Sequence, residues 1–444
     1  MTQTLIKNAL LVNEGQRFEG DLLIEQGRIA RIGADIPAAG AEVYDAAGRL
    51  LMPGMIDDQV HFRDPGLTHK ADLVSESRAA VAGGITSFME MPNTNPQTVT
   101  LDALEAKYQR AAGRSHANFA FYLGGTNDNL EQIKRLRPDQ TCGIKVFMGA
   151  STGNMLVDDP AILEAIFREA PMLIATHCED TPSIQANEAR YREQYGADIP
   201  MALHPRIRSA EACWKSSALA VELARRHDTR LHVLHITTAR ELAHFSPGQG
   251  DKRITAEACV HHLYFDEGDY AELGGLIKCN PAIKTRADRD GLRQALIDGR
   301  IDLIGTDHAP HTLAEKAGSY FNCPAGLPLV QHALPMALEL YHDGLIALEL
   351  LLDKLTHSPA RLFDLAERGY LREGYWADLA LVDLNAEDRV ERERLLYKCG
   401  WSPLEGRRLR SRIAATWVNG LQVYDGEQVA QQANGQRLKF QRQP

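Results

Sequence analysis

The two ends of the chain share a pattern of short apolar stretches separated by turns, and the middle lacks it. The stretches are residues 4–15, 20–33 and 41–54 near the start and residues 374–384, 412–420 and 421–426 near the end. Such segments are typical of short antiparallel strands. Because unpaired strand edges need a partner or a cover, we expect residues 1–51 and 372–444 to form one composite β-sandwich domain.

The middle of the chain holds apolar runs that alternate with helical stretches. The runs that we interpret as buried strands are residues 50–62, 84–93, 117–125, 142–149, 172–179, 230–237, 253–260 and 301–310. A doubly wound sheet and a TIM barrel share this alternation. Polar residues stand repeatedly at the C-terminal ends of different runs, where barrel enzymes carry their chemistry. We therefore predict an α/β fold with a (β/α)8 TIM barrel as the metal-dependent catalytic domain over residues 52–371.

Composition narrows the class of protein. A length of 444 residues suits a large barrel with an accessory domain. The net charge of -10 argues against a nucleic-acid or anionic-membrane partner, since those partners favour clustered Lys and Arg. The seven cysteines are scattered and form no CxxC pair, as in reduced intracellular proteins. With no signal-peptide pattern and no apolar run of about 18 residues, we expect a cytoplasmic protein with a small-molecule substrate.

Five residues at predicted strand ends have side chains that suit a metal ion. They stand at the ends of the first, fourth, fifth, sixth and eighth strands and are His61, Lys145, His177, His235 and Asp307. Alone, each histidine has an ordinary interpretation as a hydrogen-bonded structural residue. Together, imidazole and carboxylate groups at one end of a barrel favour Zn2+ or a similar divalent ion.

Lys145 is unusual because apolar residues surround it in a predicted barrel strand. A lysine there is costly unless its charge is lost, paired or chemically altered. One interpretation is a strand-end lysine whose ammonium group reaches solvent. The other is a carbamylated lysine, whose new carboxylate could bridge two divalent ions.

We expect structural roles for the other histidines of these segments. His232 lies three residues before His235, so alternation along a strand predicts that the two side chains point to opposite faces. His261 and His262 follow the seventh strand and suit packing or support of the site. His204 suits the first turn of a helix.

At these positions the chain resembles the amidohydrolase superfamily and, in its cyclic amidohydrolase branch, the dihydroorotases. The similarity covers nearly the whole chain. The segments that carry it are PGMIDDQVHFRDPGLTHK, AGGITSFMEMPNTNP, GIKVFMGASTGN, THCE, HVLHIT and GTDHAPHTLAEK. The combination of VHFRDPG, MPNTNP and DHAPH favours dihydroorotase over hydantoinase and allantoinase, which usually lack that Arg and Asn set.

The resemblance implies a zinc site with one or two ions bridged by carbamylated Lys145. One ion would be held by His61 and Asp307, and the other by His177 and His235. The substrate carboxylate would be bound by Arg63 and Asn93, and the ring would be contacted by His311 and the backbone near Ala325 and Gly326. A loop from Ser151 to Met155 would close over the substrate.

The chain departs from the family pattern at three places. Gln59 stands where metal-binding members usually have the first histidine of His-x-His, and glutamine is a poor zinc ligand beside imidazole. Asn280 stands where some relatives carry an arginine near the substrate, and we count it among the substrate-binding residues. Ala325 stands where relatives often have proline.

The implied reaction is reversible hydrolysis of (S)-dihydroorotate to N-carbamoyl-L-aspartate in de novo pyrimidine (UMP) biosynthesis. A metal-bound water supplies hydroxide near neutral pH, and Asp307 would take its proton and pass it to the leaving nitrogen. One alternative is another cyclic amidase, which is a dihydropyrimidinase, hydantoinase or allantoinase. The second alternative is a silent dihydroorotase-like scaffold for aspartate transcarbamoylase, and Gln59 is the feature in its favour. A homodimer is a further expectation from the family.

Overall fold

A computed structural model describes residues 3–149, 155–248, 250 and 252–442 of the chain. Parallel strands in its middle form a barrel: β6 (Met55–Val60), β7 (Ile85–Glu90), β8 (Asn118–Phe121) with its continuation β9 (Leu123–Gly124), β10 (Ile144–Phe147), β11 (Ile174–His177), β12 (Leu231–Val233), β13 (Ile254–Cys259) and β14 (Leu303–Gly305). Each strand pairs with the next, and a bridge between Val60 and His308 closes the ring. The backbone N–H of His61 donates to the carbonyl of His308 at 2.7 Å across this closure. The predicted TIM barrel is confirmed.

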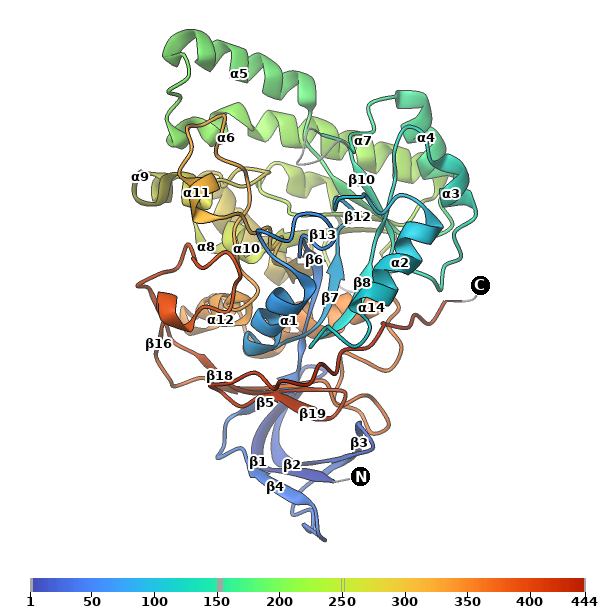
Figure 1. The fold of residues 1–444 in the computed structure, drawn as a ribbon, viewed down its shortest axis with the longest axis vertical. Helices are drawn as coiled ribbons and strands as arrows, with labels where there is room; N and C mark the ends of the chain where they lie inside the picture. Colours follow the sequence, from blue (N-terminus) through green and yellow to red (C-terminus); the bar gives the residue numbers. More distant parts are fainter. Residues whose placement is uncertain (1–2, 150–154, 249, 251, 443–444) are drawn as a thin grey trace.

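Helices cover the outside of the barrel (Figure 1). They are α1 (Leu73–Ala82), α2 (Leu101–Ala111), α3 (Leu130–Lys134), α4 (Pro160–Glu169), α5 (Thr181–Tyr195), α6 (His204–Ile207), α7 (Ala210–His227), α8 (Val260–Tyr264), α9 (Tyr270–Leu273), α10 (Arg286–Asp298), α11 (Leu313–Lys316), α12 (Ala333–His342), α13 (Leu348–Leu352) and α14 (Ser358–Leu362). Polar caps set where several of them begin. The side chain of Asp72 accepts from two backbone N–H groups of α1, and Thr285 and Ser209 cap α10 and α7. His204 begins α6, as predicted.

The barrel strands are buried on their inner and outer faces, which explains their continuous apolar runs. On β7, Phe88 belongs to the outer core beneath the helices and Met89 to the core inside the barrel. On β11, Ile174 likewise belongs to the outer core and Ala175 to the core inside the barrel. This alternation carries polar residues at the strand ends into the barrel mouth.

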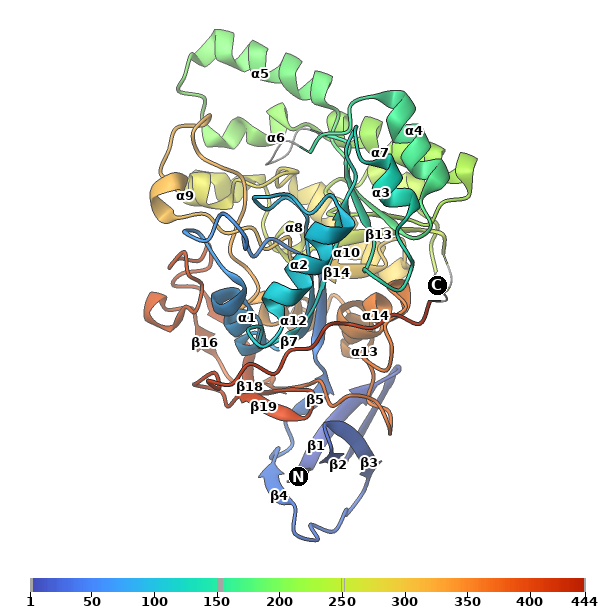
Figure 2. The ribbon, with the colours of Figure 1, turned by 45° about the vertical axis from the view of Figure 1, so that its right-hand side comes forward.

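The strands at the two chain ends come together, as predicted, and they form one separate eight-stranded sheet. Its main path runs β19 (Leu421–Tyr424), β18 (Arg412–Val418), β15 (Leu379–Asp383), β5 (Leu50–Pro53), β1 (Thr4–Asn13), β2 (Gln16–Glu25) and β3 (Arg28–Gly33), and β4 (Glu42–Asp45) pairs with β1. Figure 2 shows the sheet below the barrel, with strands from the two ends side by side. Tyr44 of β4 meets Trp417 of β18 edge to face, with ring centroids 5.1 Å apart.

The chain after the sheet returns to the barrel. The backbone of Arg437 forms an isolated parallel β-bridge with Phe119 of β8. The Arg442 guanidinium donates to the carbonyls of Thr141 and Cys142. Two short strands, β16 (Asp388–Arg389) and β17 (Arg408–Leu409), pair in the segment between β15 and β18. The seven cysteines carry free thiols. Within the described ranges, every helix is too short or too polar to cross a membrane.

Replacing Trp417 by alanine tests whether the composite sheet has its own core. Trp417 is 1% exposed and packs in a cluster with residues of β1, β2 and β15. Loss of a buried tryptophan costs about 3–5 kcal/mol, so we expect a clearly lower urea midpoint by circular dichroism. Leu421→Ala, on the neighbouring strand and 39% exposed, is the control. Equal midpoints for the two variants would contradict this account of the sheet.

Candidate active site

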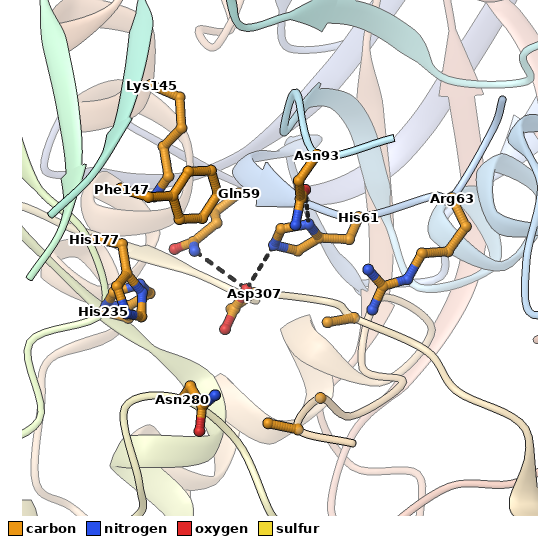
Figure 3. A pocket seen from close by; sticks show the side chains of 13 residues that line it. Gln59, His61, Arg63, Asn93, Lys145, Phe147, His177, His235, Asn280 and Asp307 are labelled. Carbon is orange, nitrogen blue, oxygen red and sulfur yellow. Dashed lines mark hydrogen bonds and ion pairs between the residues drawn. The ribbon is translucent and has the colours of Figure 1, made fainter. Parts of the chain in front are cut away.

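The structure brings most of the predicted site residues into one cavity at the C-terminal ends of the barrel strands (Figure 3). The cavity is lined by Gln59, His61, Arg63, Asn93, Lys145, Phe147, His177, His235, Asn280, Asp307, Ala309, Ala325 and Gly326. His311 lies behind Arg63 and is fully buried. In Figure 3, His177 and His235 stand on one side of Asp307 and Arg63 on the other. The cavity therefore has a side rich in imidazole and a side that carries a guanidinium.

Three residues of the cavity other than glycine have positive backbone φ angles. These are Arg63 at 66°, His235 at 40° and Asp307 at 48°. Non-glycine residues rarely adopt this conformation, and such strain tends to cluster at functional sites. Each of these residues follows the end of a barrel strand, so the turn redirects the side chain toward the barrel axis.

The prediction that His232 and His235 point to opposite faces is wrong. His232 lies inside the barrel, where Nε2 is 3.3 Å from Oδ2 of Asp58, and His235 lines the cavity above it. Strand β12 ends at Val233, and the positive φ of His235 breaks the alternation that the prediction assumed. The two side chains consequently face the same interior at different depths.

His177 is oriented by a buried carboxylate. Its Nε2 lies 3.1 Å from Oε2 of Glu179, which also pairs with Arg208. Burial alone would raise the pKa of Glu179, but Arg208 and His177 outweigh it and lower that pKa to about 2. Because the carboxylate accepts the Nε2–H, the lone pair of His177 is on Nδ1, 3.0 Å from Nε2 of His235.

His61 and Asp307 contact each other between the pair of imidazoles, His177 and His235, and the Arg63 guanidinium (Figure 3). Nδ1 of His61 lies 2.8 Å from Oδ1 of Asn93, and Nε2 lies 3.1 Å from Oδ1 of Asp307. The Nε2 amide of Gln59 donates to the same Asp307 oxygen at 3.1 Å. Burial alone would raise the pKa of Asp307, but His61 outweighs it, so the pKa is lowered and the group stays ionised.

Lys145 is buried between these groups. It is 1% exposed, its Nζ lies 4.6 Å from the centroid of the Phe147 ring, and the atom has no hydrogen-bond partner within the described part of the chain. Burial lowers the pKa of Lys145 to about 8. The interpretation of a lysine that reaches solvent is therefore wrong. An amine without a partner, close to its neutral form, suits chemical modification, and carbamylation stays a prediction.

The donor set fits a divalent ion on the side of His177 and His235. Two ligands at about 2.05 Å from a tetrahedral zinc lie about 3.3 Å apart, close to the 3.0 Å between the two imidazole nitrogens. The orphaned Nζ of Lys145 opens onto the same space. The position near His61 fits less well, because Gln59 presents an amide N–H there and not a lone pair.

Arg63 is held from behind, away from the imidazole pair. Its Nε donates to the carbonyl of Pro310 at 3.2 Å, and Nη2 lies 3.2 Å from Nε2 of His311. Nδ1 of His311 lies 3.0 Å from Nζ of Lys70. Burial and the neighbouring cations Arg63 and Lys70 lower the pKa of His311, so its ring is neutral. A neutral ring can accept one of these hydrogen bonds only, which leaves guanidinium capacity for an anion in the cavity.

The remaining predicted site residues are Asn280, Ala325, Gly326 and those of the loop from Ser151 to Met155. Asn280 lines the cavity, and its Oδ1 has no hydrogen-bond partner among the residues described. The carbonyl of Ala325 lies 3.0 Å from Nε2 of His311. Gly326 has a φ of 142°, and a Cβ there would lie 2.2 Å from the carbonyl oxygen of Ala309, so no side chain fits. Most of the predicted loop, from Ser151 to Asn154, lies outside the described residues.

Sequence reasoning missed several residues that build the site. Phe147 lines the cavity two residues after Lys145 on the same strand, so alternation would have placed it there. Glu179 follows His177 at the same spacing. Arg208 comes from the segment after α6 and has no local signal.

Comparisons with known proteins find relatives over nearly the whole chain. The chain matches the model of the amidohydrolase family over residues 50–423. It is 33% identical to a dihydroorotase of Halobacterium salinarum over 96% of this chain and 97% of that one. It is 31% identical to an allantoinase of Solibacter usitatus over 99% of this chain and 97% of that one. Among solved structures, the L-hydantoinase (dihydropyrimidinase) from Arthrobacter aurescens has a TM-score of 0.92 at 29% identity and covers 99% of this chain and 100% of that one.

A double-mutant cycle tests the support beneath His177. Arg208→Met leaves the Glu179 carboxylate buried beside a neutral side chain, which costs about 3–5 kcal/mol, whereas adding Glu179→Gln removes that charge. We expect the double variant to be more stable to urea than Arg208→Met alone. Additive losses would contradict the pairing.

The same pair predicts a dependence of stability on pH. The folded pKa of Glu179 is lowered, so its contribution is present above its ordinary pKa of about 4.3 and is lost as pH falls toward 2. In Glu179→Gln this part of the acid destabilisation should be absent.

Proposed function

Because the chain belongs to the amidohydrolase family, we propose that it is a dihydroorotase, which interconverts (S)-dihydroorotate and N-carbamoyl-L-aspartate. Relatives in sequence and in structure support hydrolysis of a cyclic amide, and they include dihydroorotases, an allantoinase and hydantoinases. The observation that carries the choice of substrate is Arg63 in the same cavity as His177, His235 and Lys145. Dihydroorotate differs from other cyclic amides by a carboxylate on its ring.

The guanidinium side of the cavity would bind that carboxylate. A guanidinium suits a planar carboxylate because it can donate two parallel hydrogen bonds. The carbonyl of Pro310 accepts from Nε of Arg63 and holds the side chain in place, so little side-chain entropy would be lost on binding. Asn93, beside His61, would complete the recognition, and Asn280 would face the ring from the opposite wall.

The imidazole side would hold the divalent ion, for which we propose Zn2+. When bound, this ion supplies an activated water near neutral pH and polarises the scissile carbonyl. His177 Nδ1, His235 Nε2 and a carbamylated Lys145 would be its ligands. Because Gln59 offers Asp307 an N–H, we expect the position near His61 to bind a second ion weakly or to remain without one.

Asp307 would move the proton. It lies between the two sides of the cavity in Figure 3, and hydrogen bonding to His61 keeps its carboxylate ionised. An ionised carboxylate can take a proton from the attacking water and return it to the leaving ring nitrogen. Gln59 and His61 both contact Oδ1 and would fix the orientation of the group during transfer.

Removal of the metal or of either key residue should abolish turnover. We expect dihydroorotate hydrolysis to disappear after chelation and to return with Zn2+. Asp307→Ala should lose at least about 10²–10⁴-fold in kcat, the range for a general base, and Lys145→Ala should lose activity with its metal. Lys134→Ala, at an exposed position, is the control. Full activity in Lys145→Ala or Asp307→Ala would overturn the mechanism. A zinc-loaded wild type that hydrolyses neither dihydroorotate nor dihydrouracil nor hydantoin would favour the scaffold alternative.

Replacing Arg63 should separate dihydroorotase from its relatives. Loss of a charged hydrogen bond to the carboxylate costs about 1.5–3 kcal/mol, so Arg63→Gln should reduce kcat/KM for dihydroorotate about 10–100-fold. Dihydrouracil has the same ring without the carboxylate, and its turnover should not fall. If wild type prefers dihydrouracil or hydantoin and Arg63→Gln leaves that preference unchanged, the hydantoinase alternative holds.

A further inference from the structure

A second group of metal-suited side chains lies inside the barrel, below the cavity. Asp58 of β6, His232 of β12 and Glu257 of β13 are each 0% exposed. Nε2 of His232 lies 3.3 Å from Oδ2 of Asp58 and 3.8 Å from Oε2 of Glu257. None of the three lines the cavity above. Strands β12 and β13 are neighbours and β6 follows β14 around the barrel, and the three side chains meet in the barrel interior.

The hydrogen bonds of His232 define which nitrogen faces the carboxylates. Nδ1 lies 2.8 Å from Oγ1 of Thr255, and that hydroxyl donates its single hydrogen to the carbonyl of Leu231 at 3.2 Å. Thr255 must therefore accept from Nδ1–H. In a neutral ring, the lone pair is on Nε2 and faces two carboxylates, which is repulsive unless a cation stands between them.

The carboxylate oxygens are also unpartnered. Across the described residues, Oδ1 and Oδ2 of Asp58 and Oε2 of Glu257 have no hydrogen-bond donor, and the contact from Nε2 of His232 does not meet hydrogen-bond geometry. Buried carboxylates without donors or a counter-ion are strongly unfavourable. Gly305 adds to the space between them, because a Cβ there would lie 2.9 Å from Cδ of Glu257 and 3.0 Å from Oδ1 of Asp58.

We propose that Asp58, His232 and Glu257 bind a divalent transition-metal ion of the zinc type, separate from the ion of the catalytic cavity. Ligands at about 2.0–2.2 Å from a tetrahedral ion lie about 3.3–3.6 Å apart. The 3.3 Å between Nε2 and the Asp58 oxygen falls in this range, and the 3.8 Å between Nε2 and the Glu257 oxygen lies just above it. One imidazole and two carboxylates suit zinc or a related ion better than Mg2+ or Ca2+, which prefer oxygen ligands alone. The ion makes the cluster neutral.

A proton is the competing occupant. Burial lowers the pKa of His232, but the Asp58 and Glu257 carboxylates outweigh burial and raise it to about 9. The cluster therefore demands positive charge. An imidazolium beside two carboxylates would leave one buried negative charge. Burial raises the pKa of Glu257 to about 7, so a second proton on Glu257 can remove that charge. A divalent ion makes the cluster neutral without either proton and gives the unpartnered carboxylate oxygens a partner.

The ion has a structural consequence for the cavity. Oε1 of Glu257 accepts from the backbone N–H of His235 at 3.3 Å and from the Cys259 thiol at 2.9 Å. An ion on Oε2 would fix the Glu257 carboxylate and, through it, the backbone of His235 at its positive φ. It acts as a positioning ion and touches no substrate.

Crystals of the wild-type chain grown with Zn2+ test the proposal directly. Anomalous differences measured on the two sides of the zinc absorption edge should show a peak among Asp58, His232 and Glu257. This peak does not depend on whether zinc also occupies the cavity. Absence of zinc among the three side chains overturns the proposal.

Zinc content in solution distinguishes this proposal from the proposed function. After dialysis against a chelator, His177→Ala/His235→Ala should keep about one zinc per chain, and adding Asp58→Asn should reduce it at least about tenfold. Asp57→Asn is the matched control, since Asp57 is equally buried but accepts from Thr306. Circular dichroism checks that each variant folds. No zinc in a folded His177→Ala/His235→Ala chain overturns the buried site and leaves the proposed function intact. Zinc retained there, together with a zinc-loaded wild type that does not hydrolyse dihydroorotate, supports the buried site and overturns the proposed function.

Discussion

The structure depends on one constraint, which is the free-energy cost of removing ionisable side chains from water in the barrel and beneath its helices. Glu90 and Lys107 form a fully buried ion pair at 3.1 Å, and burial still raises the pKa of Glu90 to about 7. Glu76 and His308 pair at 2.9 Å with no exposure. An isolated buried charge costs several kcal/mol. Every such group must therefore have a partner, lose its charge or bind an ion.

Ion pairs that the chain completes by itself lie around the site, and incomplete groups lie in the cavity and directly below it. Glu179 has Arg208 and His177, and its pKa falls accordingly. Lys145 has no such partner, and burial lowers its pKa to about 8. The ion pairs around the site show that buried charge is compensated there. The unpaired groups therefore mark where the chain is completed from outside, which is the physical basis of the proposed metal and substrate.

The sequence predicted the barrel and most of the cavity because both follow from periodicity. Alternation places Gln59, His61 and Arg63 on one face, and all three line the cavity. Prediction failed where the backbone departs from that period. The positive φ of His235 turns its side chain to the interior that His232 also faces, which strand parity excluded. Arg208 could not be predicted at all, because its pairing with Glu179 spans different elements and depends on the fold.

A local irregularity in strand β6 turns two neighbouring side chains into the barrel interior at different depths. Alternation would place Asp58 opposite to Gln59, yet the pairing of β6 with β7 shifts between Asp57 and Val60. Asp58 consequently faces the barrel axis beside Glu257, and Gln59 faces the cavity beside Asp307. In the family pattern the position of Gln59 is usually a histidine. This chain therefore lacks that histidine at the cavity and has the Asp58 carboxylate directly below it. On our proposals, this chain binds an ion at Asp58, below the cavity, in place of the ion that a histidine at position 59 would help to hold. The lower ion would then stabilise the strand end that carries His61, and the upper site would work with the ligands of His177, His235 and Lys145.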